Sequence, residues 1–237
     1  SLQVAASAWG PADGARWRWA IDAEAWRPPG GADGGEFRLL LGLLPEGSER
    51  DDVLLFPTLR DRKRSLLGRV LARTACARAL GAEDFSGFEV RRTKGGKPFL
   101  AAPQPQGLPN FNFNVSHDGR WVVLAADPLR LVGADVAAPQ AARGDAEDDS
   151  WLEDVGTTLY SSERDLVSQE PTPCGRYGIF QRLWSAKEAI AKAVGQGLDF
   201  GLDRIEVELD GGGPVAEAPR SDADAGAPWT AGARAGP

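Results

Sequence analysis

A helical segment that ends in glycine limits what this chain can fold into more than any other stretch. Residues of high helix propensity run through positions 181–194, and Gly195 can take the left-handed conformation that ends a helix. Trp184, Glu188 and Lys192 follow at intervals of four and form one stripe. The simpler interpretation is a solvated Glu188–Lys192 ion pair on a surface helix. An apolar face beside the stripe is expected to pack into a core: Leu183, Ala186, Ile190 and Ala193.

Composition restricts the class of protein. The chain has 237 residues, 42% of them hydrophobic, which is enough for one large domain or two small ones. No apolar run approaches the ~20 residues of a membrane span, and no signal peptide is recognisable. Two cysteines give no disulfide framework, so we expect a cytoplasmic protein without membrane contact.

The charge is unevenly distributed. A formal net charge of -7 argues against general nucleic-acid binding, which requires a basic surface. Residues 60–78 are the local exception, with seven basic residues against the single acid Asp61. This segment also has the apolar spacing of a helix over residues 59–80, with Gly81 as its stop. Its basic side chains indicate either an anionic partner or a merely solvated face.

Alternating patterns predict strands upstream of the glycine-terminated helix. Residues 16–22 and 88–92 have the pattern of half-buried strands. The second runs into a loop of two lysines and two glycines, which suits either an ordinary hairpin turn or an anion site. Residues 110–126 predict a hairpin around Asp118-Gly119, with His117, the only histidine, beside the turn.

Two further strands are expected in the second part of the chain, at residues 129–136 and 204–209. Asp135 lies inside the first of these apolar runs, where a carboxylate needs a cation, a metal or several donors. Gly133 would let another backbone or a ligand approach closely.

The polar signals gain meaning from their order. Along the chain they are Arg92, Lys97-Pro98, Asn114-Val115-Ser116-His117, Gly133-Ala134-Asp135, and Trp184-x-x-Lys187-Glu188 with Lys192. This order resembles the 4'-phosphopantetheinyl transferase superfamily, and in particular its monomeric, broad-specificity branch. The combination of Gly-x-Asp with Trp-x-x-Lys-Glu-x-x-x-Lys about fifty residues later is specific, whereas each signature alone is weak.

The resemblance implies an α+β fold. Two similar halves with pseudo-twofold symmetry would each place a small antiparallel sheet on a helix, with the active site in the cleft between them. We expect a loose leader at residues 1–15, an N-terminal half at 16–127 and a C-terminal half at 128–210. Residues 211–237 are rich in Gly, Ala, Pro and Asp and are expected to be a disordered tail.

The resemblance also implies a reaction and its partners. The 4'-phosphopantetheine group of coenzyme A would be transferred to a serine hydroxyl of an apo carrier protein of acyl, peptidyl or aminoadipate type. Adenosine 3',5'-bisphosphate would be released. Mg²⁺ is the implied metal, and Mn²⁺ accepts the same hard oxygen ligands.

Site residues follow from the matched motifs. Asp135 and Glu188 would bind the metal and, with Lys192, act in catalysis. Glu188 is also a candidate acceptor for the serine proton. The implied coenzyme A-binding residues are Arg50, Arg92, Lys97, Asn114, Ser116, His117, Lys187 and Lys192.

Two alternatives remain open at this point. The low-complexity tail stands where relatives have further strands, so the chain could bind coenzyme A without transferring anything. A metal-dependent hydrolase of nucleotide diphosphates would use the same residues with water as the nucleophile.

Overall fold

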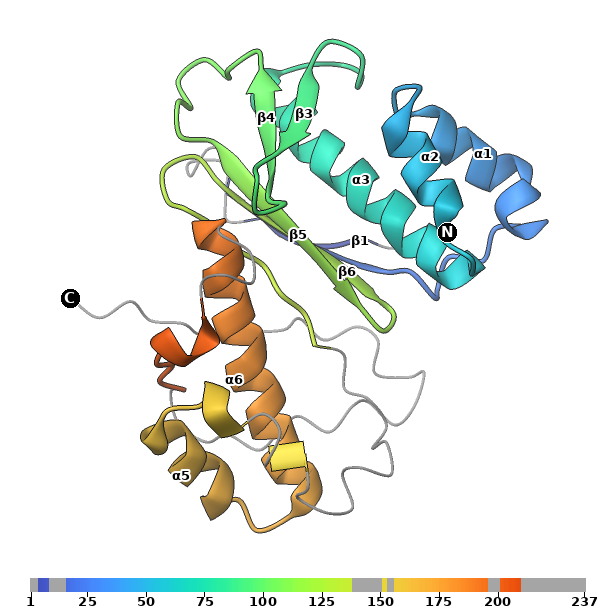
Figure 1. Cartoon of the computed structure of the whole chain (residues 1–237). Helices are drawn as coiled ribbons and strands as arrows, with labels where there is room; N and C mark the ends of the chain where they lie inside the picture. The colour runs from blue at the N-terminus through green and yellow to red at the C-terminus, as the bar shows by residue number, and fades with distance from the viewer. Residues whose placement is uncertain (1–3, 9–15, 138–150, 153–155, 196–200, 210–237) are drawn as a thin grey trace. The chain divides into compact units, whose positions relative to one another are not determined.

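The computed structural model describes residues 4–8, 16–137, 151–152, 156–195 and 201–209 (Figure 1). The chain forms two compact units: unit 1 comprises Ser1–Ala138 and Ser185–Ile205, and unit 2 comprises Pro139–Trp184 and Glu206–Pro237. Antiparallel sheets packed on helices confirm the α+β class. The predicted boundaries at residues 16–127 and 128–210 stay a prediction, and the predicted tail at 211–237 lies outside the described residues.

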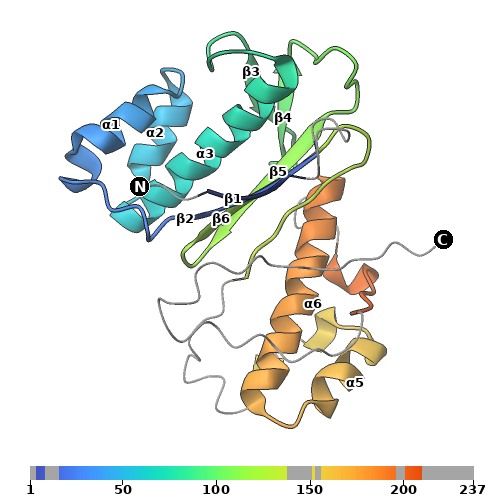
Figure 2. The same ribbon diagram turned by 180° about the vertical axis from the view of Figure 1, so that it is seen from behind.

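A four-stranded antiparallel sheet forms the centre of unit 1 (Figure 2). Its strand order is β1-β2-β6-β5, with β1 (Val4–Ala8), β2 (Trp17–Asp22), β5 (Asn112–Asp118) and β6 (Trp121–Asp127). The predicted strand at 16–22 and the predicted hairpin around Asp118-Gly119 are confirmed.

Strand β1 was not predicted, because residues 1–15 were expected to be a loose leader. Val4–Ala8 pair with β2, and a run of small residues carries little strand signal without that neighbour. A separate two-stranded sheet joins β3 (Glu89–Arg92) to β4 (Pro98–Ala102), as expected for the lysine-glycine turn.

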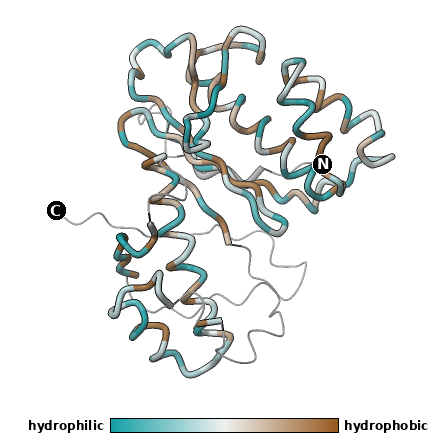
Figure 3. The backbone as a smooth tube through the Cα atoms, in the orientation of Figure 1, coloured by the Kyte–Doolittle hydropathy of each residue, from teal (hydrophilic) through white to brown (hydrophobic). Residues whose placement is uncertain are grey.

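Helix α3 (Leu59–Leu80) packs across one face of the sheet. It spans the predicted residues, with Thr58 Oγ1 accepting the amide of Asp61 at its start and Gly81 in the left-handed conformation at its end. Gly68 allows the close approach, because a Cβ added there would lie 3.3 Å from Val115 Cγ1. In Figure 3 the tube of α3 has both teal and brown parts, and its buried residues include the polar Lys63, Ser65 and Arg73 beside apolar ones.

Alternation along the strands decides which side chains face α3. Phe113 and Val115 of β5 lie on that face, and Val122 and Leu124 of β6 pair on the same side. The buried core between sheet and helices also includes residues of β2, α1 (Gly35–Gly42) and α2 (Ser48–Leu55): Trp19, Ile21, Phe37 and Val53.

Unit 2 has its own small core. Helix α5 (Ser161–Gln169) and the first half of α6 (Pro173–Val194) contribute to it, and the 3-10 turn η3 (Gly156–Thr158) precedes α5. Trp184 packs on Phe180, one turn earlier on the same helix, with ring centroids 5.7 Å apart, and lies against this core. The buried apolar residues of this core are Leu159, Val167, Phe180 and Leu183.

Helix α6 begins earlier than the predicted residue 181. Pro173 occupies its first position, and Thr172 Oγ1 accepts the amide of Gly175 at 3.1 Å as an N-cap. The two glycines that follow obscured this start in the sequence, because glycine has a low helix propensity.

The two strands predicted in the second part of the chain are wrong. Residues 131–137 form no strand, and residues 202–204 form the 3-10 turn η5 (Leu202–Arg204), followed by residues without regular structure. Within residues 128–209, the described positions contain no strand, so the sheet expected in the C-terminal half is not seen there. No helix among the described residues is long and apolar enough to cross a membrane.

Candidate active site

Alternate side chains of β5 hold the segment that carries Asp135. Asn112 Oδ1 accepts the amide of Val132 at 2.9 Å, and Asn114 Oδ1 accepts the amide of Ala134 at 2.9 Å. Ser116 then donates to Asp135 Oδ1 at 3.0 Å. We call Asn112, Asn114 and Ser116 the β5 ladder. Side chains thus replace the backbone partners of a strand, which explains why an extended run at 131–136 forms none.

Gly133 brings this segment against α6. A Cβ added to Gly133 would lie 1.7 Å from the carbonyl oxygen of Ala189 and 2.7 Å from the amide nitrogen of Ala193. Only glycine therefore fits, which agrees with the close backbone approach expected from the sequence. In an extended segment residues two apart share a face, so Asp135 points to the same side as Gly133.

Asp135 is the centre of a hydrogen-bonded group. Its Oδ1 accepts from Ser116 and forms an ion pair with Lys192, and its Oδ2 accepts from Ser185 Oγ at 2.9 Å. Lys192 Nζ also lies 3.3 Å from Ser116 Oγ. We call Ser116, Asp135, Ser185 and Lys192 the Asp135 cluster. The side chain of Asp135 is only 10% exposed, so these donors supply the partners that a buried carboxylate was expected to need.

Glu188 belongs to the same face of α6 as two members of this cluster. Ser185 and Lys192 are two turns apart and both contact Asp135. Glu188 lies between them, three residues after the first and four before the second, so it projects near that face. It is half-buried, and among the described residues its carboxylate has no hydrogen-bond partner.

The donor set fits a hard divalent cation. Two carboxylates, Asp135 and Glu188, and two hydroxyls, Ser116 and Ser185, supply oxygen only, which is what Mg²⁺ and Mn²⁺ accept. Within the described residues no group of three or more His, Cys, Asp or Glu side chains is able to hold a metal. Such an ion would therefore need ligand oxygens from phosphate or water as well.

Lys97 reaches this region from the turn between β3 and β4. Its Nζ donates to the carbonyl of Ala193 at 2.8 Å and to the carbonyl of Val132 at 2.9 Å. Burial lowers the pKa of Lys97 below its ordinary value. The structure thus brings Lys97 close to the Asp135 cluster, but its ammonium is bonded to backbone carbonyls.

His117 lies on the other face of the sheet from Ser116. It pairs with Val122 on the side that faces α3, where Arg64 lies. The side chain is exposed, yet partial desolvation lowers the pKa of His117, and the positive charges of Arg64 and then Lys192 lower it further. A neutral imidazole among cations is suited to gain a proton when an anion arrives.

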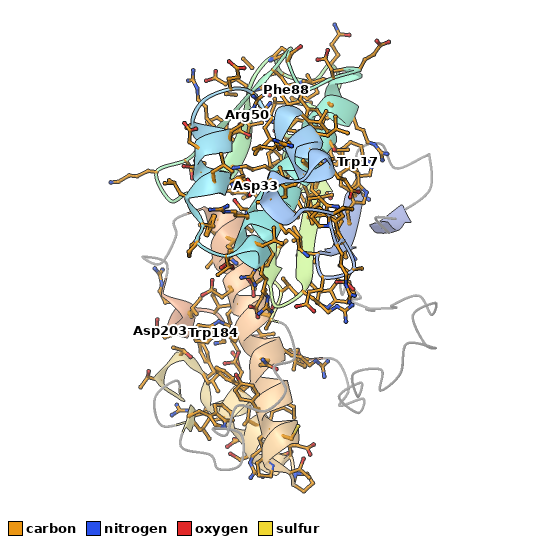
Figure 4. The ribbon with its side chains drawn as sticks, turned by 90° about the vertical axis from the view of Figure 1, so that its right-hand side faces the viewer. Trp17, Asp33, Arg50, Phe88, Trp184 and Asp203 are labelled. Atoms are coloured by element: carbon orange, nitrogen blue, oxygen red, sulfur yellow. The ribbon has the colours of Figure 1, made fainter. Side chains whose placement is uncertain are left out.

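The remaining predicted coenzyme A-binding residues lie apart from the Asp135 cluster. Arg92 donates to Gly96 within the exposed turn at 2.8 Å. Arg50, labelled in Figure 4, donates to the carbonyls of Leu44 and Gly42, at 2.7 and 2.9 Å. Lys187 is fully buried and donates to the carbonyls of Ile205 and Leu202. Its ammonium is directed to these two carbonyls in the interior of the protein.

The basic residues of α3 are mostly engaged within the chain. Arg69 pairs with Asp52 at 2.9 Å, and Arg73 pairs with Glu49 and donates to the carbonyl of Phe85. The others contact acids, carbonyls or an aromatic ring: Arg60, Arg62, Lys63, Arg64 and Arg78. The expected basic patch is therefore largely an internal scaffold that joins α3 to its neighbours.

Sequence reasoning missed Ser185, Asn112 and Arg64. Ser185 follows Trp184 within the recognised motif, and its spacing of seven from Lys192 would have placed both on one face. Asn112 precedes Asn114 by two on the same strand, so strand alternation would have indicated the β5 ladder. Nothing local in the sequence joins Arg64 to His117.

Two family models together match residues 24–129 and 131–233, which include the Asp135 cluster. Residues 24–129 match the model described as 4'-phosphopantetheinyl transferase, N-terminal. Residues 131–233 match the 4'-phosphopantetheinyl transferase superfamily model, which includes Asp135, Glu188 and Lys192.

Curated relatives agree with the models. A phosphopantetheinyl transferase of Thraustochytrium sp. is 38% identical over 206 residues, covering 81% of this chain and 65% of the relative. The L-aminoadipate-semialdehyde dehydrogenase-phosphopantetheinyl transferase of Xenopus laevis is 33% identical over 192 residues, covering 81% and 61%. A 4'-phosphopantetheinyl transferase of Bacillus subtilis is 33% identical over 182 residues, covering 77% and 73%.

The chain belongs to the 4'-phosphopantetheinyl transferase superfamily. Within it, the chain is similar to the L-aminoadipate-semialdehyde dehydrogenase-phosphopantetheinyl transferase type. The resemblance inferred from the sequence is thus confirmed. The chain spans 65% and 61% of the length of the Thraustochytrium and Xenopus relatives.

Proposed function

We propose that this protein transfers the 4'-phosphopantetheine group of coenzyme A to a serine hydroxyl of an apo carrier protein. Adenosine 3',5'-bisphosphate is the second product, and the reaction depends on Mg²⁺ or Mn²⁺. The single observation that carries the proposal is the Asp135 cluster with Glu188 on the same face of α6, in a chain of this superfamily.

The proposed chemistry breaks one phosphorus–oxygen bond and forms another. The carrier serine oxygen attacks the phosphorus attached to pantetheine, and the bond to the adenosine-bearing phosphate breaks. The serine proton passes to Glu188, directly or through water, and the electron pair stays on the departing phosphate. Since negative charge concentrates on the diphosphate, catalysis consists mainly of alignment and charge neutralisation.

The chain's own residues have separate tasks in this scheme. Asp135 and Glu188 would hold the divalent cation, which would neutralise charge on the diphosphate oxygens. Lys192 contacts the same phosphates, for which it exchanges its ion pair with Asp135. Ser116 and Ser185 fix the carboxylate of Asp135. His117 provides a donor to the adenosine phosphates, together with Arg92, the exposed last residue of β3.

Four finer properties complete the proposal. Acyl, peptidyl and aminoadipate-type carriers are the candidate acceptors, and the protein acts as a cytoplasmic monomer. A pseudo-twofold relation between the two halves is part of the proposal, and the equal length of α3 and α6, 22 residues each, supports it.

The test is a mass measurement on the acceptor. Incubation of the protein with coenzyme A, Mg²⁺ and an apo carrier protein is expected to add the mass of phosphopantetheine to the carrier. Glu188→Gln is expected to abolish the gain and to keep the circular dichroism spectrum. A well-folded chain that gives no mass gain with any of the three carrier types refutes the proposal.

The same experiment separates the two alternatives. Tight coenzyme A binding without modification of the carrier would identify a binding protein. Steady release of adenosine bisphosphate in the absence of carrier would identify a hydrolase.

A further inference from the structure

Lys97 joins three segments that are far apart in the sequence. Its Nζ donates to the carbonyl of Ala193 in the last turn of α6, to the carbonyl of Val132, and to Asn112 Oδ1 of β5, at 2.8, 2.9 and 3.4 Å. All of these residues belong to unit 1. One ammonium group thus uses its three donors on three separate acceptors.

The position suits a helix cap. The last carbonyls of an α-helix have no partner within the helix and carry partial negative charge, so a cation at this end is stabilising. The Lys97 stem adds packing, because a Cβ added to Gly195 would lie 3.5 Å from Lys97 Cδ and 3.6 Å from its Cβ. Lys97 therefore closes α6 from a turn almost a hundred residues upstream.

The same contacts fix the backbone next to two members of the Asp135 cluster. Ala193 directly follows Lys192, and Val132 is two residues from Ala134, whose amide is bound by Asn114. Lys97 therefore ties together the backbone of the two segments that carry Lys192 and Asp135. Displacement of either segment would alter the separation of these two side chains, on which catalysis depends.

We propose that Lys97 is a positioning residue, which fixes the end of α6 against residues 132–135 and so sets the placement of Lys192 relative to Asp135. This assigns to Lys97 a role within the ligand-free protein in place of the phosphate contact expected from the sequence. Its consequence for turnover rests on the proposed transferase function, whereas its consequence for stability does not.

Thermal unfolding of the ligand-free full chain tests the structural part. Lys97→Met is expected to lower the melting midpoint by about 3–6 °C, because three acceptors lose their donor and the helix end loses its cation. Lys94→Met is the matched control, since Lys94 is an exposed lysine of the same turn, and its midpoint should stay within about 1 °C. Lys97→Arg is expected to recover part of the loss.

Steady-state kinetics test the positioning part. Lys97→Met should lower kcat about tenfold or more and change KM for coenzyme A by less than about twofold, since a misplaced reactive group costs turnover. Lys97→Arg should recover part of kcat. If Lys97→Met does not fold, Lys97→Gln, which keeps a donor and loses the charge, is measured instead.

Two results would overturn the inference. One is an unchanged melting midpoint in Lys97→Met with a large rise in KM for coenzyme A and an unchanged kcat, which identifies a phosphate ligand. The other is a lowered midpoint with unchanged kcat and KM, which identifies a cap that does not position the cluster. If the parent chain shows no transfer, the proposed function fails, and an unchanged midpoint in Lys97→Met would then also overturn the cap.

Discussion

The ammonium of Lys192 and Asp135 Oδ1 form an ion pair that joins the end of α6 to the segment after β6. The two side chains are 35% and 10% exposed, so the carboxylate is the more buried partner. In the ligand-free protein the lysine thus neutralises Asp135, and in the proposed reaction it must move from this carboxylate to phosphate. The ion pair therefore has to open before Lys192 can contact the phosphates.

Replacement of Lys192 by methionine tests the role of this lysine in catalysis. We expect Lys192→Met to lower the transfer rate at least about a hundredfold, because a cation aimed at the diphosphate is lost. The effect on stability should be small, about 1 kcal/mol, because the lysine is one-third exposed. The carrier mass-gain rate and thermal unfolding measure the two quantities. A rate within twofold of the parent chain would contradict the role of Lys192.

In the absence of coenzyme A, the same variant should gain metal affinity, although it loses transfer activity. Because the ammonium no longer competes for Asp135, Lys192→Met should bind Mn²⁺ about two- to fivefold more tightly than the parent chain. Isothermal titration with MnCl₂ measures this. Lys192→Arg keeps the charge and should leave the affinity unchanged, and Glu188→Gln should weaken it. Equal affinities in Lys192→Met and the parent chain would show that the lysine does not compete with the metal for Asp135.

Ser185 is expected to affect the transfer rate by holding the carboxylate of Asp135. Ser185→Ala removes the 2.9 Å hydrogen bond to Oδ2 and should lower the transfer rate about three- to tenfold, equivalent to about 1 kcal/mol. Ser168→Ala is the matched control, because the hydroxyl of Ser168 donates to the Arg164 carbonyl on the exposed side of α5. Rates of the two variants under the same conditions decide the question. An equal, small effect in both would remove Ser185 from the site.

Gly133 should tolerate no side chain. Gly133→Ala forces a Cβ to within 1.7 Å of the Ala189 carbonyl, so α6 and the segment must separate, and we expect a loss of about 3 kcal/mol or more. Gly35→Ala, at the start of α1, has no neighbour within 4 Å and should be neutral or stabilising by up to about 1 kcal/mol. Urea unfolding of both variants checks the difference. Similar stabilities would mean that the close approach is not formed.

The lowered pKa of His117 gives a pH dependence with a defined sign. The unfolded chain, with a histidine pKa near 6.5, takes up the proton at higher pH than the folded chain. The unfolded state therefore binds more protons as pH falls, so the contribution of His117 to stability is present above pH 6.5 and is lost below it. The stability difference between the parent chain and His117→Gln should thus become less favourable to the parent chain between pH 7.5 and 5.5, as urea unfolding at both values would reveal.

If His117 binds phosphate, coenzyme A binding should favour the protonated imidazolium, whereas folding favours the neutral imidazole. An anion favours the imidazolium, so coenzyme A binding should raise the pKa of His117, take up protons near neutral pH and strengthen as pH falls. Calorimetry in two buffers of different ionisation enthalpy measures the proton uptake. His117→Gln should abolish this component, and uptake that persists in the variant would assign it to another group.

Helix α3 and the β5–β6 hairpin were predictable because their signals are local. Apolar spacing with Gly81 at the end defines the helix, and Asp118-Gly119 defines the turn. A close approach at Gly133 and the need of Asp135 for partners were also expected from the sequence. Each of these inferences depends on a few neighbouring residues.

The failures have a different physical origin. Residues 131–136 have the apolar content of a strand, but the amides of Val132 and Ala134 bond to side chains from β5. The direction of the Lys97 ammonium depends on the end of α6, and the burial of Lys187 depends on the carbonyls of Leu202 and Ile205. Such contacts join residues that are distant in the sequence, so a motif identifies the residue without giving its partner.

The β5 ladder has a consequence for hydrogen exchange. Since side-chain oxygens, and not a neighbouring backbone, accept the amides of Val132 and Ala134, the segment that carries Asp135 can detach without breaking any bond of the β5–β6 pairing. Its opening free energy should accordingly lie well below that of the sheet. The two amides would exchange with solvent faster than that of Leu124 in the central strand β6, as a separate cooperative unit, so the acidic group of the site sits on a segment that can open while the sheet stays intact.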